Sequence, residues 1–212
     1  VSSIYGVVET NLMFPLKLLE IAVSYNTKVF INTDTLLKKD INHYSLSKKQ
    51  LLEWFKYFSN NIKIINLKLE HIYGPKDDDS KFVSKIINQL LANVSNINLT
   101  KGEQKRDFIY IDDVVNVYTL VLENIYKFDS YNELDVGTGN QIELKYFIKK
   151  IYDTINNKIA IDTKLNFGAI SYRIGEPMVI DEDIKPLYKL GWKPTYSIDS
   201  GISRTIDGIL NE

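Results

Sequence analysis

Short apolar runs alternate along this chain with longer amphipathic stretches, and this alternation limits the fold more than any other feature. Residues 28–32 and 62–69 have the length and composition of buried strands, and helical periodicity lies between and after them. Strands that alternate with helices are typical of an α/β protein with a doubly wound parallel sheet. In such sheets ligands bind at the carboxyl ends of strands, where this chain turns polar at Thr33 and Asp34.

The helical stretches have recognisable starts. Thr10 or Asn11 is expected to cap a helix that runs to about residue 25, and a second helix is expected to open near Tyr44. Asp112 and Asp113 are expected to cap a later helix. The remaining helices are predicted over residues 82–92, 114–125 and 143–155.

Tyr44 and Lys48 are four positions apart, so a helix would place them on the same face. A nearby ammonium favours the ionised form of a phenol, which predicts a lowered pKa for Tyr44 and proton exchange near neutrality. Tyr146 and Lys150 have the same spacing inside a helix that is typical of ordinary packing. The spacing alone therefore does not identify a site, and the context of each pair must decide.

Composition excludes several classes of protein. A net charge of −1, from 26 basic and 27 acidic side chains, gives no basic field for nucleic acid. No apolar run reaches the roughly 20 residues of a membrane span, and no apolar leader begins the chain, so we expect a cytoplasmic protein. The absence of cysteine excludes disulfides, thiolate nucleophiles and zinc ribbons. With His43 and His71 as the only histidines, we expect no metal site.

The order of strand-end Thr33, then Tyr44, then Lys48 resembles the extended short-chain dehydrogenase/reductase family, also called the NAD-dependent epimerase/dehydratase family. The resemblance implies that Thr33 binds the reacting oxygen and that Tyr44 exchanges its proton. It implies that Lys48 holds the nicotinamide ribose of NADPH or NADH, and that Tyr44 also binds the cofactor. Asp34 is expected to contact the substrate.

The segment Leu-Glu-His-Ile-Tyr-Gly-Pro, which ends at Pro75, is similar to the CDP-abequose synthase group of 3,6-dideoxyhexose reductases within this family. His71 takes the place of an Asn that contacts the sugar-nucleotide phosphate in many relatives. An imidazole can donate to an anion but is bulkier than an amide. We therefore expect His71 to contact the substrate.

Two arginines stand out, because only three of the 26 basic residues are arginines. Taken alone, Arg106 beside Asp107 is an ordinary surface ion pair. The run Arg-Asp-Phe-Ile-Tyr-Ile-Asp-Asp and the later Arg-Ile-Gly-Glu-Pro around Arg173 resemble two family segments whose arginines grip the nucleotide diphosphate. A guanidinium fork matches phosphate oxygens better than an ammonium does. The Leu-Gly-Trp-x-Pro motif that contains Trp192 also resembles the family.

From the resemblance we expect an incomplete Rossmann-like cofactor domain at residues 1–75 and 108–140. Residues 76–107 and 141–212 would form a smaller sugar-nucleotide-binding lobe. None of the ten glycines has the Gly-x-x-Gly-x-x-Gly spacing of a dinucleotide-binding turn. We expect the chain to be part of a longer protein that carries this turn; the alternative is a cofactor-less binding or scaffold protein.

The resemblance implies NAD(P)-dependent reduction of the 4-keto group of a nucleotide diphosphate deoxyhexose. The nucleotide is expected to be CDP and the pathway O-antigen synthesis. A 4-epimerase is the alternative enzyme, because it uses the same Thr, Tyr and Lys. A 4,6-dehydratase is disfavoured, because Asp34 is followed by Thr35 and not by the Glu of dehydratases. Family members often dimerise, so the resemblance implies a homodimer through the Tyr44 helix and its neighbour.

Overall fold

The computed structural model describes residues 3–211, which form two compact units. The first unit comprises the chain up to Glu70 together with Val117–Val136 and Glu182–Trp192. The second comprises His71–Asn116, Gly137–Asp181 and the chain from Lys193 onward. These borders differ from the expected ones: residues 71–75, 108–116 and 137–140 lie in the second unit and 182–192 in the first. The assignment of a binding role to each unit stays a proposal.

The first unit is built on a parallel sheet in the order β1-β2-β6. Its strands are β1 (Val29–Thr35), β2 (Lys63–Leu69) and β6 (Tyr131–Val136). Strand β1 continues through Thr35, so Thr33 and Asp34 lie inside the strand and not beyond its end. The predicted α/β class with a parallel sheet is confirmed.

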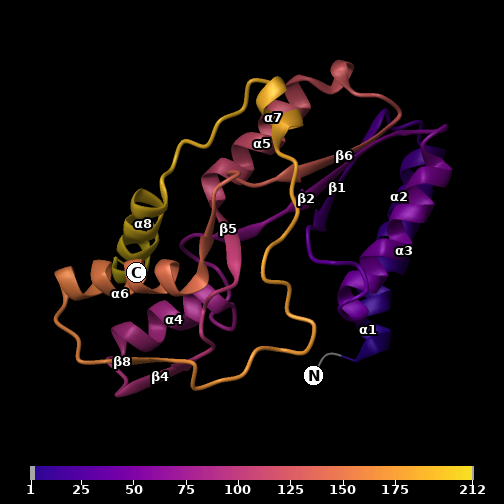
Figure 1. Ribbon diagram of the computed structural model, residues 1–212. Coiled ribbons are helices and arrows are strands. Elements are labelled where there is room, and N and C mark those ends of the chain that lie inside the picture. The colour runs from indigo at the N-terminus through magenta and orange to yellow at the C-terminus, as the bar shows by residue number, and fades with distance from the viewer. Residues whose placement is uncertain (1–2, 212) are drawn as a thin grey trace. The chain divides into compact units, whose positions relative to one another are not determined.

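Helices α2 (Phe14–Ser24) and α3 (His43–Phe58) lie side by side against this sheet (Figure 1). Leu19 and Leu51 are fully buried between them, and the Phe55 ring packs against Phe30 of β1. The unit also contains α1 (Ile4–Val8), the π-helix η1 (Glu9–Met13), the 3-10 helix η2 (Ile125–Lys127) and α7 (Lys185–Lys189).

The predicted cap at Thr10 or Asn11 is wrong, because helical structure already begins at Ile4 with Ser3 as its cap. Both residues lie in the π-helix η1.

The second unit contains a three-stranded sheet in the order β3-β5-β7 and a parallel pair, β4 with β8. The strands are β3 (His71–Tyr73), β4 (Asn96–Leu99), β5 (Lys105–Tyr110), β7 (Gln141–Glu143) and β8 (Lys164–Phe167). The helices of its core are α4 (Phe82–Leu91), α6 (Leu144–Lys158) and α8 (Ile198–Leu210). Phe108 stacks on Phe147 with ring centroids 3.6 Å apart, which joins β5 to α6.

Helix α5 (Ile111–Glu123) contributes residues to both units. It starts earlier than expected, so Asp112 and Asp113 lie inside its first turn. The Asp113 carboxylate is fully buried and accepts hydrogen bonds from the backbone N–H groups of Thr195 and Tyr196. The predicted capping role of Asp113 is therefore replaced by a role in fixing the chain before α8. No helix within residues 3–211 combines the length and apolarity needed to cross a membrane.

Candidate active site

Helix α3 begins with a capping box that fixes where Tyr44 lies. The Asn42 side chain accepts a hydrogen bond from the backbone of Ser45, and the Ser45 hydroxyl accepts one from the backbone of Asn42. Ser45 and Ser47 are buried, whereas Tyr44 keeps 38% of its surface exposed. Tyr44 therefore stands in the first helical turn, and its side chain remains accessible to a ligand.

Lys48 joins this helix to the carboxyl-terminal half of β1. Its Nζ donates to the backbone carbonyl of Thr33 over 3.0 Å. Burial lowers the pKa of Lys48, although the negative charge of Asp34 acts in the opposite direction. An ammonium carries three N–H donors, so donors remain for ligand hydroxyls after this bond is made.

The pKa of Tyr44 moves opposite to the sequence-based prediction. Burial raises the pKa of the phenol above its ordinary value, and the nearby Asp34 carboxylate raises it further. The predicted lowering is wrong for this structure, because burial and then the Asp34 carboxylate raise the pKa of the phenol, while the Lys48 ammonium is directed to a backbone carbonyl.

Strand alternation places the side chains of Thr33 and Asp34 on opposite faces of β1. Asp34 lies on the same face as Phe30, which packs against α3. The Thr33 hydroxyl instead shares a short hydrogen bond with the phenol of Tyr118 on α5. Convergence of the Thr33 and Tyr44 hydroxyls on one substrate oxygen stays a prediction.

Asp34 is held in a buried polar network. Its Oδ1 accepts from Lys39 Nζ at 2.6 Å and from the Thr35 backbone N–H at 2.8 Å, and its Oδ2 accepts from Asn66 Nδ2 at 3.1 Å. Asn32 donates in turn to Asn66 over 2.7 Å. The Asp34 side chain is fully buried. The structure thus gives Asp34 a structural role, and its contact with the substrate stays a prediction.

Sequence reasoning missed Lys39 and Tyr118. Alternation along β1 was a usable signal, because it requires Asp34 to face the helix side and predicts a buried partner for its charge. No pattern in the sequence connects Tyr118 to Thr33, which lies 85 positions away.

In the second unit, Arg106 does not form the surface pair with Asp107 that its position suggests. Arg106 is only 5% exposed; its Nη2 pairs with Glu176 and its Nη1 donates to the Lys105 carbonyl over 2.6 Å. The Asp107 carboxylate accepts instead from the backbone of Gly139 and from Thr138. The interpretation as a weak surface ion pair is therefore wrong.

Arg173 lies in the segment that Arg106 holds. The backbone N–H of Glu176 donates to the Arg173 carbonyl over 3.1 Å, so Arg173 and Glu176 share one turn. The Lys105 N–H also donates to the Met178 carbonyl, which ties the segment to β5. Arg173 itself is exposed. The segments of the two predicted arginines therefore lie together, although a joint grip on one diphosphate stays a prediction.

His71 begins strand β3 and is partly exposed. It pairs in register with Phe108 of β5, and the two rings meet edge to face at 5.8 Å. Its proposed contact with a substrate phosphate is not tested by this geometry.

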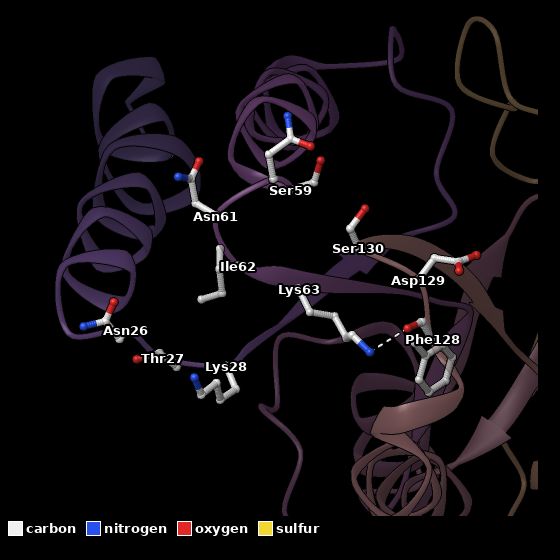
Figure 2. Close-up of a pocket in the computed structure, with 11 residues that line it drawn as sticks. Asn26, Thr27, Lys28, Ser59, Asn61, Ile62, Lys63, Phe128, Asp129 and Ser130 are labelled. Atoms are coloured by element: carbon white, nitrogen blue, oxygen red, sulfur yellow. Dashed lines mark hydrogen bonds between the residues drawn. The ribbon is translucent and has the colours of Figure 1, made fainter.

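A cavity of about 370 Å³ lies at the other end of the first sheet, near the amino termini of β1 and β2. Figure 2 shows Lys63 pointing across it toward Phe128, whose carbonyl accepts from Lys63 Nζ over 2.5 Å. This pocket is far along the strands from Thr33, so it is not the candidate active site.

Comparison with known proteins gives consistent matches. The family model described as "NAD dependent epimerase/dehydratase family" matches residues 2–137. The chain is 38% identical to the CDP-abequose synthase of Salmonella typhimurium over 97% of this chain and 71% of that protein. It is 34% identical to the CDP-abequose synthase of Salmonella muenchen over 92% of this chain and 68% of that protein.

Among solved structures, the UDP-N-acetylglucosamine 4-epimerase of Methanobrevibacter ruminantium superposes with a TM-score of 0.82. The alignment covers 100% of this chain and 74% of that chain at 21% identity. At this identity the likeness shows the fold, which is the Rossmann-like fold expected from the sequence.

Proposed function

Because this chain belongs to the NAD dependent epimerase/dehydratase family, we propose that it reduces the 4-keto group of a nucleotide diphosphate deoxyhexose. The predicted family and enzyme class, an NAD(P)-dependent sugar-nucleotide oxidoreductase, are confirmed by these matches. The CDP-abequose synthase relatives favour a CDP-linked sugar and a place in O-antigen synthesis.

One contact carries the proposal most directly: the bond from Lys48 Nζ to the Thr33 carbonyl, which fixes the Tyr44 helix to the strand that bears Thr33. The remaining Lys48 donors fit the hydroxyls of a nicotinamide ribose. None of the ten glycines has the Gly-x-x-Gly-x-x-Gly spacing of a dinucleotide-binding turn, so we assign Tyr44 and Lys48 to the nicotinamide half of a dinucleotide and not to its pyrophosphate.

Bound NADPH or NADH would supply a hydride to C4 of the sugar. Tyr44 would donate its proton to the oxygen on that carbon, and its raised pKa keeps the phenol protonated until it is needed. Thr33 would donate a hydrogen bond to the same oxygen and stabilise the charge that develops there. Lys48 would hold the ribose.

In the second unit we assign the diphosphate to Arg106 and Arg173, with His71 as a further contact. Glu176 pairs with Arg106, so the diphosphate would compete with a carboxylate for that guanidinium. A diphosphate brings more negative charge and more acceptor oxygens than one carboxylate, which favours the exchange. Binding energy at this remote group would position C4 for reaction.

A 4-epimerase is the second candidate, because a putative UDP-glucose 4-epimerase of Methanocaldococcus jannaschii is 28% identical over 81% of this chain. The two reactions differ in cofactor use. A reductase consumes one NAD(P)H per sugar, whereas an epimerase returns the hydride to the sugar.

A panel of CDP-, dTDP- and UDP-linked 4-keto sugars with NADPH and NADH tests the proposal. We expect stoichiometric loss of nicotinamide absorbance, greatest with a CDP sugar. Turnover without net loss of NAD(P)H would favour the epimerase, and absence of any reaction across the panel would count against both.

A homodimer is part of the proposal. Apolar side chains are exposed on both neighbouring helices, including Leu18 and Ile21 of α2 and Trp54 and Tyr57 of α3. A second copy would cover this surface. Light scattering should give twice the monomer mass, and Tyr57→Glu should shift it toward the monomer.

A cytoplasmic location is also proposed, because nucleotide sugars and NAD(P)H meet there.

A further inference from the structure

The hydroxyl of Thr33 has a partner that no sequence motif indicates. It shares a hydrogen bond with the phenol of Tyr118, which comes from α5. The contact lies in an exposed environment, so a substrate can reach the same hydroxyl. We propose that Tyr118 is a positioning residue, which donates to Thr33 and thereby directs the Thr33 proton toward the reacting oxygen. This inference rests on the proposed function of Thr33.

The chemistry of the two hydroxyls favours one direction for the bond. Each carries one hydrogen and two acceptor lone pairs. The phenol is the more acidic of the two, so Tyr118 is the better donor and Thr33 the better acceptor. Thr33 then keeps its own hydrogen for a substrate. An accepted hydrogen bond also polarises the hydroxyl, which makes it a stronger donor.

Both partners stand on regular structure, which suits a positioning role. Thr33 pairs in register with Leu67, which is fully buried in the middle strand β2. On α5, Val117 and Val121 are fully buried on either side of Tyr118. The phenol is therefore presented by an anchored helix and not by a loop.

The test uses Tyr118→Phe, which removes one oxygen, in the full natural chain with NADPH and the CDP-4-keto sugar. We expect kcat to fall about three- to ten-fold with little change in KM, as for loss of one neutral hydrogen bond. In a Thr33→Ser background the same loss should persist. In a Thr33→Val background Tyr118→Phe should have no further effect.

Tyr126→Phe is the matched control, because Tyr126 is 77% exposed and lies in η2 close by in sequence. It should leave kcat unchanged. If the wild type is active but Tyr118→Phe leaves kcat unchanged, this inference alone is overturned. The same holds if Tyr118→Phe lowers kcat as much in the Thr33→Val background as in the wild type. A lowered Tm with unchanged kinetics also overturns it, because only a structural role would remain. An inactive wild type overturns the proposed function and this inference with it.

Discussion

The chain contains two Tyr–Lys pairs of identical spacing, and the structure gives them different surroundings. On α6, Lys150 Nζ lies 5.0 Å from the centroid of the Tyr146 ring and forms an ion pair with Asp199. The hydrogen bond that Lys150 donates to the Asp199 carboxylate raises the pKa of Lys150. This is a lysine whose charge is already balanced by a carboxylate at the surface.

On α3, Lys48 donates instead to a backbone carbonyl, and burial lowers its pKa. A carbonyl accepts a hydrogen bond but does not neutralise the ammonium. Lys48 therefore keeps its charge for a ligand, whereas the Lys150 charge is already compensated. The difference teaches that the partner of the lysine, and not the four-residue spacing, separates a candidate site from ordinary packing.

Replacing each tyrosine by phenylalanine gives the largest expected contrast. Tyr44→Phe should lower kcat by about 10²- to 10⁴-fold, because a positioned acid contributes that much to catalysis. The kcat of Tyr146→Phe should stay within about two-fold of the wild-type value, because Tyr146 lies on the surface of helix α6. Steady-state kinetics with NADPH and the preferred 4-keto sugar measure both variants. Equal losses would show that the choice between the pairs was wrong.

The ion pairs of the two regions should differ in their contribution to stability. Lys39→Met would leave the fully buried Asp34 carboxylate without its cation, which should lower the free energy of unfolding by about 3 kcal/mol. Lys150→Met breaks a pair whose Asp199 side chain is 71% exposed, and should cost at most about 1 kcal/mol. Urea unfolding measures both. A smaller effect at Lys39 than at Lys150 would contradict the buried network.

Much of the fold could be predicted from the sequence, because each strand and helix has its own periodicity. The helix predicted over 82–92 is α4, and the one predicted over 143–155 is α6, with ends that differ by up to three residues. The division between the two units could not be predicted. It depends on long-range contacts, such as the segment 182–192 joining the first unit, and these leave no local pattern.

The part of the candidate site whose residues lie on a single helix was predictable. The shared face of Tyr44 and Lys48 follows from helical spacing, whereas the capping box at Asn42 that fixes the helix start was not predicted. The charge environment of Tyr44 was predictable only in part, because strand alternation indicates which face Asp34 occupies but not which lysine pairs with it. Asp34 acts on the phenol only because β1 turns its side chain toward the helix face, and Lys39 returns from the following loop to pair with it.

The arginines extend the comparison to the second unit. There too, a positive charge is either available to a ligand or already engaged within the protein. Arg106→Lys and Arg173→Lys keep the positive charge but lose the guanidinium fork that matches two phosphate oxygens. Each should reduce kcat/KM by about ten- to a hundred-fold, or roughly 1.5–3 kcal/mol for a charged hydrogen bond. Arg204→Lys is the control, because its guanidinium lies over the Tyr196 ring, 5.3 Å from the centroid.

Free CDP gives a second measurement of the same variants. It should inhibit the wild type and the Arg204→Lys variant competitively, and the Arg106 and Arg173 variants more weakly. If all three variants bind CDP as the wild type does, the assignment of the diphosphate to these arginines fails.

The smallest expected effect is a shift in pH dependence when the acidic neighbour of each pair is neutralised. Tyr44 works as an acid only while it is protonated, so kcat should fall as the pH rises through its pKa. Burial and then Asp34 raise that pKa; burial lowers the pKa of Lys48, and the charge of Asp34 opposes that lowering. Asp34→Asn removes the negative charge, so both groups lose their protons at lower pH. The alkaline limb of the kcat profile should therefore move to lower pH.

Asp199→Asn lowers the pKa of Lys150 by the same reasoning, but it should leave the profile in place, because that lysine lies outside the proposed site. A shift to higher pH in Asp34→Asn, or equal shifts in the two variants, would remove Tyr44 as the group that controls this limb.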